Sequence, residues 1–175
     1  MDLEKVIDLC LKNDPEGQKL LYEKFINPMA RLCTRYIEDD EEVADVLIEG
    51  FMKVFDSLKK FEYRSDQALE AWIKKIMINQ CLGALRKKRK ILKVRDEMNV
   101  QEVHDQESEI AAEEIIDLIR LLPNGYRAIF NLAVIDGYSH KEIAEILGIS
   151  ESTSRSQLTR ARNLLKNILR KNGWN

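Results

Sequence analysis

The sequence predicts an all-α protein made of two small helical domains. Apolar residues recur at every third or fourth position over most of the chain, which is the spacing of amphipathic helices. No stretch of useful length alternates apolar and polar residues as a half-buried strand does. The 175 residues are 45% hydrophobic and 33% charged, with 7 Gly and 3 Pro. This composition favours a soluble, helix-rich globular protein of one or two domains.

Four amphipathic helices are expected in the first half of the chain. The first ends at the sequence KNDPEG, which favours a turn. The second contains Asn27-Pro28, where we expect a kink or break because proline has no backbone N–H. The third carries its acids in the first turn, where they suit the helix dipole. The irregular sequence KKFEYRSDQA is expected to be a loop before the fourth helix. The apolar stripes of the four helices cover residues 3–11, 20–37, 43–58 and 72–85.

An acidic, polar segment separates these helices from the second half. Residues 96–111 contain only isolated apolar residues, which is typical of a linker. Fully extended, about 16 residues reach roughly 53–58 Å. Two further helices are expected over 115–122, ended by Pro123, and over 126–134, ended by Asp136-Gly137.

The sequence GYSHKEIAEILGISESTSRSQLTRAR predicts a helix-turn-helix. Ser139 and Glu142 have the spacing of a capping box, and Gly148 stands where a helix ends in a left-handed residue. Ser150 can then cap the next helix. Leu158, Ala161 and Leu165 share one stripe of this second helix and should pack inward. The other face offers hydroxyls and arginines, which suit phosphates and base edges in the DNA major groove. Its residues are Ser152, Thr153, Arg155, Ser156, Thr159 and Arg160.

The charges come in blocks of alternating sign, although the formal net charge is only −2. Residues 38–49 hold seven acids and no Lys or Arg, and residues 71–95 hold nine bases and no acid. Residues 96–117 again hold nine acids without a base, whereas 151–175 hold six bases against Glu151 alone. Such blocks indicate surfaces with different partners.

The basic block of residues 71–95 begins among aromatic residues. Phe61, Tyr63 and Trp72 interleave with Arg64, Lys74 and Lys75. Aromatic rings beside cations suit single-stranded nucleic acid, because unstacked bases rest on rings while cations hold phosphates. The alternative is that Phe61 and Trp72 are core residues, and partial burial of Trp72 is expected.

The chain resembles a sigma factor of the sigma-70 family, in the small extracytoplasmic-function group, over nearly its whole length. The residues LPNGYRAIFNLAVIDGYSHKEIAEILGISESTSRSQLTRARNLLK are similar to the family's region four. More loosely, EEVADVLIEGFMKVFDSLKKFEYRSDQALEAWIKKIMINQCLGALRKKRK is similar to region two. This resemblance implies a region two domain over 1–95, a linker over 96–111 and a region four domain over 112–175.

The resemblance also implies partners and roles. It implies binding to core RNA polymerase and to promoter DNA, and control by an anti-sigma factor. It assigns docking on the coiled coil of the polymerase's largest subunit to Asp45, Leu47, Glu49 and Phe51. It assigns melting and capture of the −10 strand to Phe61, Tyr63, Arg64, Trp72, Lys74, Lys75, Asn79 and Arg86. Reading of the −35 duplex falls on the recognition residues 152–160 named above. Gly50, Ile78, Gly83 and Ser154 depart from the family pattern.

Two other classes of protein remain as alternatives. An ordinary helix-turn-helix regulator with an N-terminal sensing or dimerisation domain does not explain the aromatic and basic block. An adaptor or anti-sigma protein leaves the recognition helix unexplained. We expect no enzyme, no cofactor and no small-molecule substrate, because no phosphate loop, catalytic triad or metal set is present. Cys10, Cys33 and Cys81 are expected to be buried free thiols. The chain is expected to be cytoplasmic and not membrane-embedded, since no apolar run approaches the ~20 residues of a membrane span.

Overall fold

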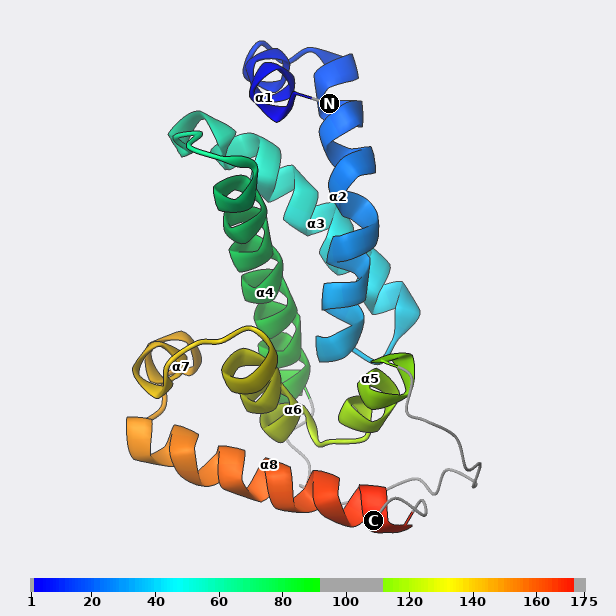
Figure 1. The fold of residues 1–175 in the computed structure, drawn as a ribbon, viewed down its shortest axis with the longest axis vertical. Coiled ribbons are helices and arrows are strands. Elements are labelled where there is room, and N and C mark those ends of the chain that lie inside the picture. Colours follow the sequence, from blue (N-terminus) through cyan, green and yellow to red (C-terminus); the bar gives the residue numbers. More distant parts are fainter. Residues whose placement is uncertain (1, 92–111, 172–175) are drawn as a thin grey trace. The chain divides into compact units, whose positions relative to one another are not determined.

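The described part of the chain is helical throughout its regular elements. The structure is a computed structural model that describes residues 2–91 and 112–171 (Figure 1). Within these residues there is no strand, which confirms the all-α prediction. The chain separates into two compact units, Met1–Leu92 and Lys93–Asn175. The expected linker over 96–111 lies outside the described residues.

The first unit is a helical bundle. It contains α1 (Leu3–Leu11), α2 (Pro15–Tyr36), α3 (Asp40–Ser57), the short 3₁₀ helix η1 (Leu58–Lys60) and α4 (Asp66–Ile91). Helices α2, α3 and α4 pack on one another, and α1 packs on α2. Their apolar stripes meet in a core whose fully enclosed side chains include Leu21, Met29, Cys33, Tyr36, Val54, Leu69, Ile73, Met77 and Cys81.

Side-chain caps fix where α2 and α3 begin. The Asp14 carboxylate accepts a hydrogen bond from the Glu16 N–H at 2.8 Å, and Pro15 follows as the first helical residue. The Asp39 carboxylate accepts one from the Glu42 N–H at 2.9 Å. Both aspartates satisfy N–H groups that have no partner inside the helix. The acids in the first turn of α3 also complement the helix dipole, as expected.

Of the kink or break expected at Pro28, the break is wrong, because α2 runs through this residue as one helix. A proline inside a helix removes one hydrogen bond, in this case to the carbonyl of Lys24. Lys24 lies on the exposed side of α2, where water can hydrate its carbonyl. Phe25 and Met29, on either side of Pro28, are both buried in the same core, and this packing favours a continuous helix.

The loop before α4 is shorter than expected. Lys59 and Lys60 belong to η1, and α4 already begins at Asp66. Only residues 61–65 lack helical structure between these two elements. The Ser65 hydroxyl accepts a hydrogen bond from the Ala68 N–H at 3.1 Å, which caps α4 and explains the early start.

Gly50 explains how closely α3 approaches α4. A Cβ atom at this buried position would lie 2.3 Å from Sδ of Met77 and 2.9 Å from its Cε. Glycine in a helix costs about 1 kcal/mol relative to alanine. The departure from the family pattern at Gly50 therefore has a packing reason, since Met77 of α4 occupies the space that a side chain would need.

The second unit contains five helical segments within its described residues. These are α5 (Ala112–Arg120), α6 (Asn124–Phe130), the π-helical turn η2 (Asn131–Ile135), α7 (His140–Leu147) and α8 (Glu151–Lys171). Helix α8 packs against α5, α6 and α7. Ile119, Leu122, Ile129, Leu132, Ile143 and Ala161 form the centre of this core.

A buried arginine joins α5 to α6. Arg127 is only 1% exposed. Its guanidinium donates to the carbonyl of Arg120, the last residue of α5, at 2.7 Å, and to the side-chain oxygen of Asn124 at the start of α6. A carbonyl at a helix end has no partner inside the helix, so Arg127 satisfies it and fixes the corner at Pro123.

The expected helix over 126–134 changes type part of the way along. After Phe130 the backbone widens into the π-helical turn, and the Asp136 N–H donates to the Asn131 carbonyl at 2.8 Å. This five-residue step shifts the phase of the side chains. Val134, the last residue of the expected helix, is exposed, and so is Ile135.

Candidate nucleic-acid interface

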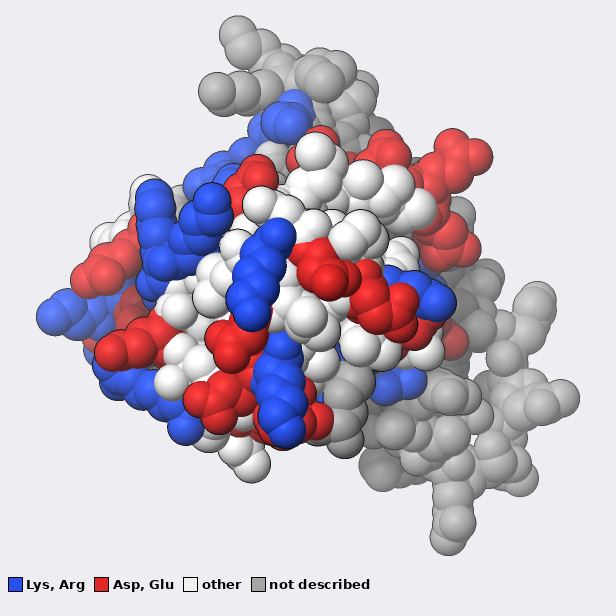
Figure 2. Space-filling model, turned by 90° about the horizontal axis from the view of Figure 1, so that it is seen from above, with Lys and Arg blue, Asp and Glu red and all other residues white. Residues whose placement is uncertain are grey.

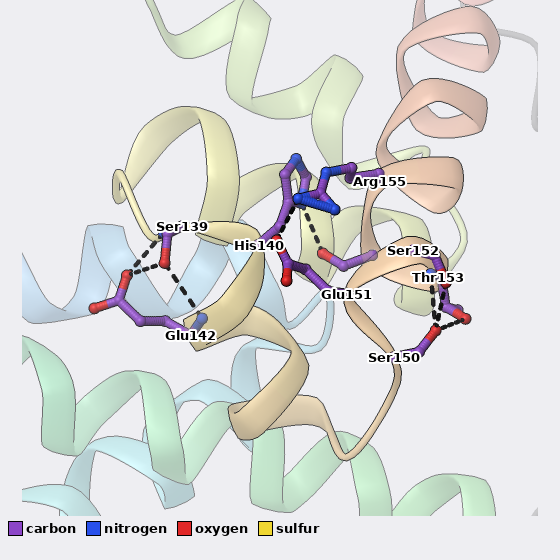
Figure 3. Close-up of polar contacts among 9 residues, drawn as sticks. Ser139, His140, Glu142, Ser150, Glu151, Ser152, Thr153 and Arg155 are labelled. Atoms are coloured by element: carbon purple, nitrogen blue, oxygen red, sulfur yellow. Dashed lines mark hydrogen bonds and ion pairs between the residues drawn. The ribbon is translucent and has the colours of Figure 1, made fainter.

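The helix-turn-helix is built by the local signals that the sequence contains. The Ser139 N–H donates to the Glu142 carboxylate at 2.8 Å, and the Glu142 N–H donates to the Ser139 hydroxyl at 3.3 Å (Figure 3). This pair is the predicted capping box of α7. Gly148 ends α7 with a φ of 67°, which is the left-handed region that glycine adopts without strain. The turn thus orients α8 relative to α7.

A hydroxyl network caps α8, the second helix of the motif. The Ser150 hydroxyl accepts from the Thr153 N–H at 3.0 Å, as predicted for a capping residue. It also contacts the hydroxyls of Ser152 at 2.9 Å and Thr153 at 2.7 Å (Figure 3). Thr153 is half-buried and takes part in this cap, so its side chain is less available to DNA than those of its neighbours.

Ser154 joins the two helices of the motif. It is fully buried, and its hydroxyl shares a hydrogen bond of 2.9 Å with Nδ1 of His140 at the start of α7. Sequence reasoning assigned no role to His140 and identified Ser154 only as a departure from the family pattern. The signal in the sequence was spacing, because Ser154 is four residues before Leu158 on the inward stripe, where a polar group needs a partner.

The outward face of α8 carries the predicted recognition residues. Leu158 and Ala161 are buried and Leu165 is half-buried, so the predicted inward stripe does face the core. The opposite face is solvent-exposed and consists of Ser152, Arg155, Ser156, Thr159 and Arg160.

Several groups on this face already have partners within α8. Arg155 forms an ion pair with Glu151, one turn before it (Figure 3). The Ser156 hydroxyl donates to the Thr153 carbonyl at 3.0 Å, and the Thr159 hydroxyl donates to the Arg155 carbonyl at 3.1 Å.

In the first unit, α4 presents a mixed aromatic and polar stripe. Trp72, Lys75, Asn79 and Arg86 follow at steps of three, four and seven residues, so they share one side of the helix. Lys75, Asn79 and Arg86 are exposed and Trp72 is half-buried. Lys74, predicted with them, points to another side, where it pairs with Glu70 at 2.7 Å.

The loop before α4 adds the remaining predicted residues to the same end of the stripe. The rings of Phe61 and Trp72 stack with centroids 4.7 Å apart and an angle of 30° between their planes. Both rings are half-buried. They are therefore neither pure core residues nor fully exposed, the two interpretations that the sequence allowed. Arg64 is exposed and forms an ion pair with Glu62 at 2.9 Å.

Tyr63 is anchored by its hydroxyl. The phenol donates a hydrogen bond of 2.5 Å to the Asp66 carboxylate at the start of α4. Ionisation of the phenol would place two negative charges side by side, so this hydrogen bond, and then desolvation, raise the pKa of Tyr63 to about 12. The contact holds the loop of residues 61–65 against the helix.

Of the four residues of α3 that are predicted to contact the polymerase, two are exposed and two are buried. Asp45 and Glu49 are exposed, but Leu47 and Phe51 are core residues, 8% and 3% exposed. Two apolar residues that sequence reasoning missed lie on the exposed side instead: Ile48 is 58% and Met52 61% exposed.

A shallow cleft adjoins this face. Its volume is about 320 Å³, and α3 lines it with three carboxylates and one apolar side chain, while α4 supplies one base. The lining residues are Glu42, Asp45, Val46, Glu49, Gln80, Gly83, Ala84 and Lys87. The cleft therefore offers mainly negative charge to a partner.

The three cysteines are buried free thiols, as predicted. A hydrogen bond with Cys33, and then burial, raise the pKa of the Cys81 thiol. Burial also raises the pKa of Cys10. A protonated thiol is a poor nucleophile and a poor metal ligand. Among residues 2–91 and 112–171, no group of His, Cys, Asp and Glu side chains is arranged to hold a metal ion. No helix in this part of the chain is long and apolar enough to cross a bilayer.

Two family matches cover most of the chain. The family described as Sigma-70 region 2 matches residues 21–91, and the family described as Sigma-70, region 4 matches residues 112–165. The first match includes α3 and α4 with the aromatic stripe, and the second includes the helix-turn-helix. The chain is therefore an RNA polymerase sigma factor and belongs to the sigma-70 family.

Curated relatives narrow this assignment. The chain is 26% identical to the "ECF RNA polymerase sigma-E factor" of Haemophilus influenzae, over 94% of this chain and 93% of that protein. It is 27% identical to the Escherichia coli K12 protein of the same name, over 93% and 91% of the two chains. Within the sigma-70 family, the chain is a member of the extracytoplasmic-function, or ECF, group.

Solved structures share the fold. The sigma factor RpoE from Bartonella quintana, in complex with the anti-sigma factor NepR, matches with a TM-score of 0.56 and 22% identity, over 87% of this chain and 96% of that one. CnrH, in complex with the cytosolic domain of CnrY, matches with a TM-score of 0.51 and 20% identity, over 94% of each chain.

Proposed function

We propose that this sigma factor binds core RNA polymerase and directs it to promoters by reading a −35 duplex with α8 and capturing the melted −10 strand with α4 and the loop before it. The observation that carries this function is the capped helix-turn-helix, whose second helix exposes two arginines and three hydroxyls on one face. An α-helix fits the major groove, where arginine and hydroxyl side chains can bond to base edges and phosphates.

The −10 role is supported by the stripe on α4. The half-buried Phe61–Trp72 pair offers ring faces to unstacked bases, and Lys75 and Arg86 lie on the same side of the helix to hold phosphates. Asn79 lies between them and can both donate to and accept from a base edge. We assign Lys74 a lesser role, because Glu70 neutralises it on another side of α4.

The polymerase-docking role is assigned to the exposed side of α3. Asp45 and Glu49 remain part of it, and Ile48 and Met52 replace the buried Leu47 and Phe51. A surface of two exposed apolar side chains edged by acids suits a partner helix that carries apolar residues and bases. The acidic cleft beside it can take a basic side chain of that partner.

The remaining assignments rest on family membership. We propose a region two domain over 1–95, an acidic linker over 96–111 and a region four domain over 112–175. An anti-sigma factor is a further proposed partner, since the similar sigma factor RpoE was determined in complex with the anti-sigma factor NepR. A sigma factor of this kind works in the cytoplasm beside the polymerase and leaves catalysis to it.

Reconstitution of the holoenzyme tests the proposal. The purified full chain is mixed with bacterial core polymerase, and the mixture is used to transcribe a genomic library. We expect run-off products that share two spaced promoter elements, and their loss with Arg155→Ala or Arg160→Ala. Lys141→Ala, at an exposed base on α7 outside the recognition face, is the control that keeps activity.

The docking surface has its own test. Ile48→Ala and Met52→Ala should weaken core binding, whereas Leu11→Ala, at an exposed apolar residue of α1, should not. Absence of core binding by the unmodified chain, together with direct binding to a palindromic duplex, would point to an ordinary regulator and refute the sigma-factor function.

A further inference from the structure

The exposed face of α8 has hydroxyls along its centre and arginines along its edges. At about 100° per residue, Ser152, Ser156 and Thr159 lie within about 60° of one another. Arg155 lies to one side of this central line and Arg160 to the other, separated by about 140°. When such a helix enters a groove, its centre faces the bases and its edges face the two backbones. Ser156 and Thr159 therefore stand where base edges are met.

The protons of these two hydroxyls are already in use. Ser156 Oγ lies 3.0 Å from the carbonyl oxygen of Thr153, and Thr159 Oγ1 lies 3.1 Å from that of Arg155. A carbonyl oxygen can only accept, so the hydroxyl must be the donor in both contacts. Each oxygen keeps its lone pairs, and both residues are exposed. Both groups are hydrogen-bond acceptors with no proton left to give.

A group that can only accept hydrogen bonds cannot bond to most polar atoms of DNA. Phosphate oxygens, guanine O6 and N7, and thymine O4 are themselves acceptors. The major groove offers only two donors, the N6 amino group of adenine and the N4 amino group of cytosine. We propose that Ser156 and Thr159 accept hydrogen bonds from these exocyclic amino groups. Each base pair has one such group, on its adenine or its cytosine, so the strand nearer each hydroxyl carries adenine or cytosine opposite the centre of α8. This inference rests on the proposed function of α8 and specifies its chemistry.

The neighbouring arginines are hydrogen-bond donors, whereas the two hydroxyls are acceptors. Arg155 and Arg160 can only donate, so they suit phosphates or guanine at the edges of the face. Ser152 differs from Ser156 and Thr159, because its hydroxyl contacts the hydroxyl of Ser150, where either group can be the donor. On the exposed face of α8, the acceptor-only state thus belongs to Ser156 and Thr159, whose hydroxyls bond back to helix carbonyls.

Base analogues without the amino group test the proposal directly. A promoter is first recovered from a genomic library by wild-type holoenzyme. Each −35 adenine is then replaced by purine, and each cytosine by pyrimidin-2-one, which lack only the amino group. Holoenzyme affinity is measured on every duplex for the wild type and for Ser156→Ala and Thr159→Val. One hydrogen bond is worth about 0.5–1.5 kcal/mol, so we expect a loss of about two- to tenfold at the positions read.

The decisive result is the loss of sensitivity in the variants. Thr159→Val should bind the unmodified promoter about two- to tenfold less tightly and should show no further loss on the analogue at its position. Thr34→Val is the matched control, because the Thr34 hydroxyl also bonds back to its own helix, donating to the Arg31 carbonyl at 3.1 Å in α2. This control should leave promoter affinity and analogue sensitivity unchanged.

Other outcomes overturn the inference in distinguishable ways. If both variants keep the full sensitivity to every analogue, other groups read the amino positions and the inference is wrong. If the variants weaken all duplexes equally and no analogue matters, the hydroxyls have turned to phosphates and the inference is again wrong. If wild-type holoenzyme selects no −35 element at all, the proposed function of α8 fails and this inference falls with it.

Discussion

Replacing Gly50 with alanine tests the packing of α3 on α4. The new Cβ would lie 2.3 Å from Sδ of Met77, whereas such atoms pack at about 3.5–4.0 Å. The overlap is therefore at least about 1.2 Å. Met77 is fully buried, so its thioether has no solvent to move into.

Two opposing free energies set the size of the effect. Alanine improves helix propensity by about 1 kcal/mol, and overpacking a core costs about 1–3 kcal/mol. We expect Gly50→Ala to lower the free energy of unfolding by about 0–2 kcal/mol. Gly83→Ala is the matched control on α4, because a Cβ added there would meet nothing within 4 Å beyond its own helix backbone and chain neighbours. It should gain about 1 kcal/mol from propensity alone.

Urea unfolding measures the difference. Trp174→Phe in all variants leaves Trp72 of α4 as the single tryptophan, so its fluorescence follows the first unit. Gly50→Ala should be less stable than Gly83→Ala by about 1–3 kcal/mol. Met77→Val, which removes the Sδ and Cε atoms, should reduce the loss caused by Gly50→Ala. Equal stabilisation by the two alanine variants would refute a tight approach of α3 and α4.

Three further predictions concern local contacts. Gly17→Ala should destabilise the first unit by about 1–3 kcal/mol in urea unfolding, because its Cβ would lie 2.5 Å from that of Leu9 and 2.9 Å from a backbone nitrogen. The phenol of Tyr63 should titrate near pH 12 by ultraviolet absorbance, and Asp66→Ala should lower this pKa towards about 10. Because the folded-state pKa is raised, this contact stabilises the fold fully below about pH 10 and is lost as the pH rises through about 12. Ser139→Ala should lower the stability of α7 by about 1 kcal/mol, seen as faster hydrogen exchange of its amides, and unchanged exchange would count against the capping box.

Local signals predicted most of the second unit. The capping box, the left-handed glycine and the serine cap act within a few residues, so the sequence alone specifies where α7 ends and where both α7 and α8 begin. The π-helical turn after Phe130 could not be read in the same way, because the apolar spacing continues across it. The pairing of Ser154 with His140 joins residues on two different helices, and only the fold brings them together.

Helix α3 shows where the family resemblance and the helical spacing disagree. Leu47 and Phe51 lie at helical spacing within the apolar stripe expected over 43–58, whereas the family resemblance assigned them to a surface that binds the polymerase. The structure supports the spacing, since both side chains are buried. Ile48 and Met52 broke the apolar period, and this was the signal in the sequence that they face outward. A break at Pro28 was wrongly allowed because the surrounding core, rather than local propensity, decides whether a helix continues.

In the ion pairs described above, the chain's own carboxylates neutralise some of its bases. Arg64, Lys74 and Arg155 each contact a carboxylate close by in sequence, and acidic and basic side chains lie beside one another over the face seen in Figure 2. Binding of a cation to phosphate normally gains free energy because the DNA releases condensed ions into solution. If the proposed DNA contacts of these bases form, each must first break an ion pair with a carboxylate. We therefore expect a smaller gain from ion release than the number of bases suggests, and a greater dependence of site selection on the polymerase that presents the chain to DNA.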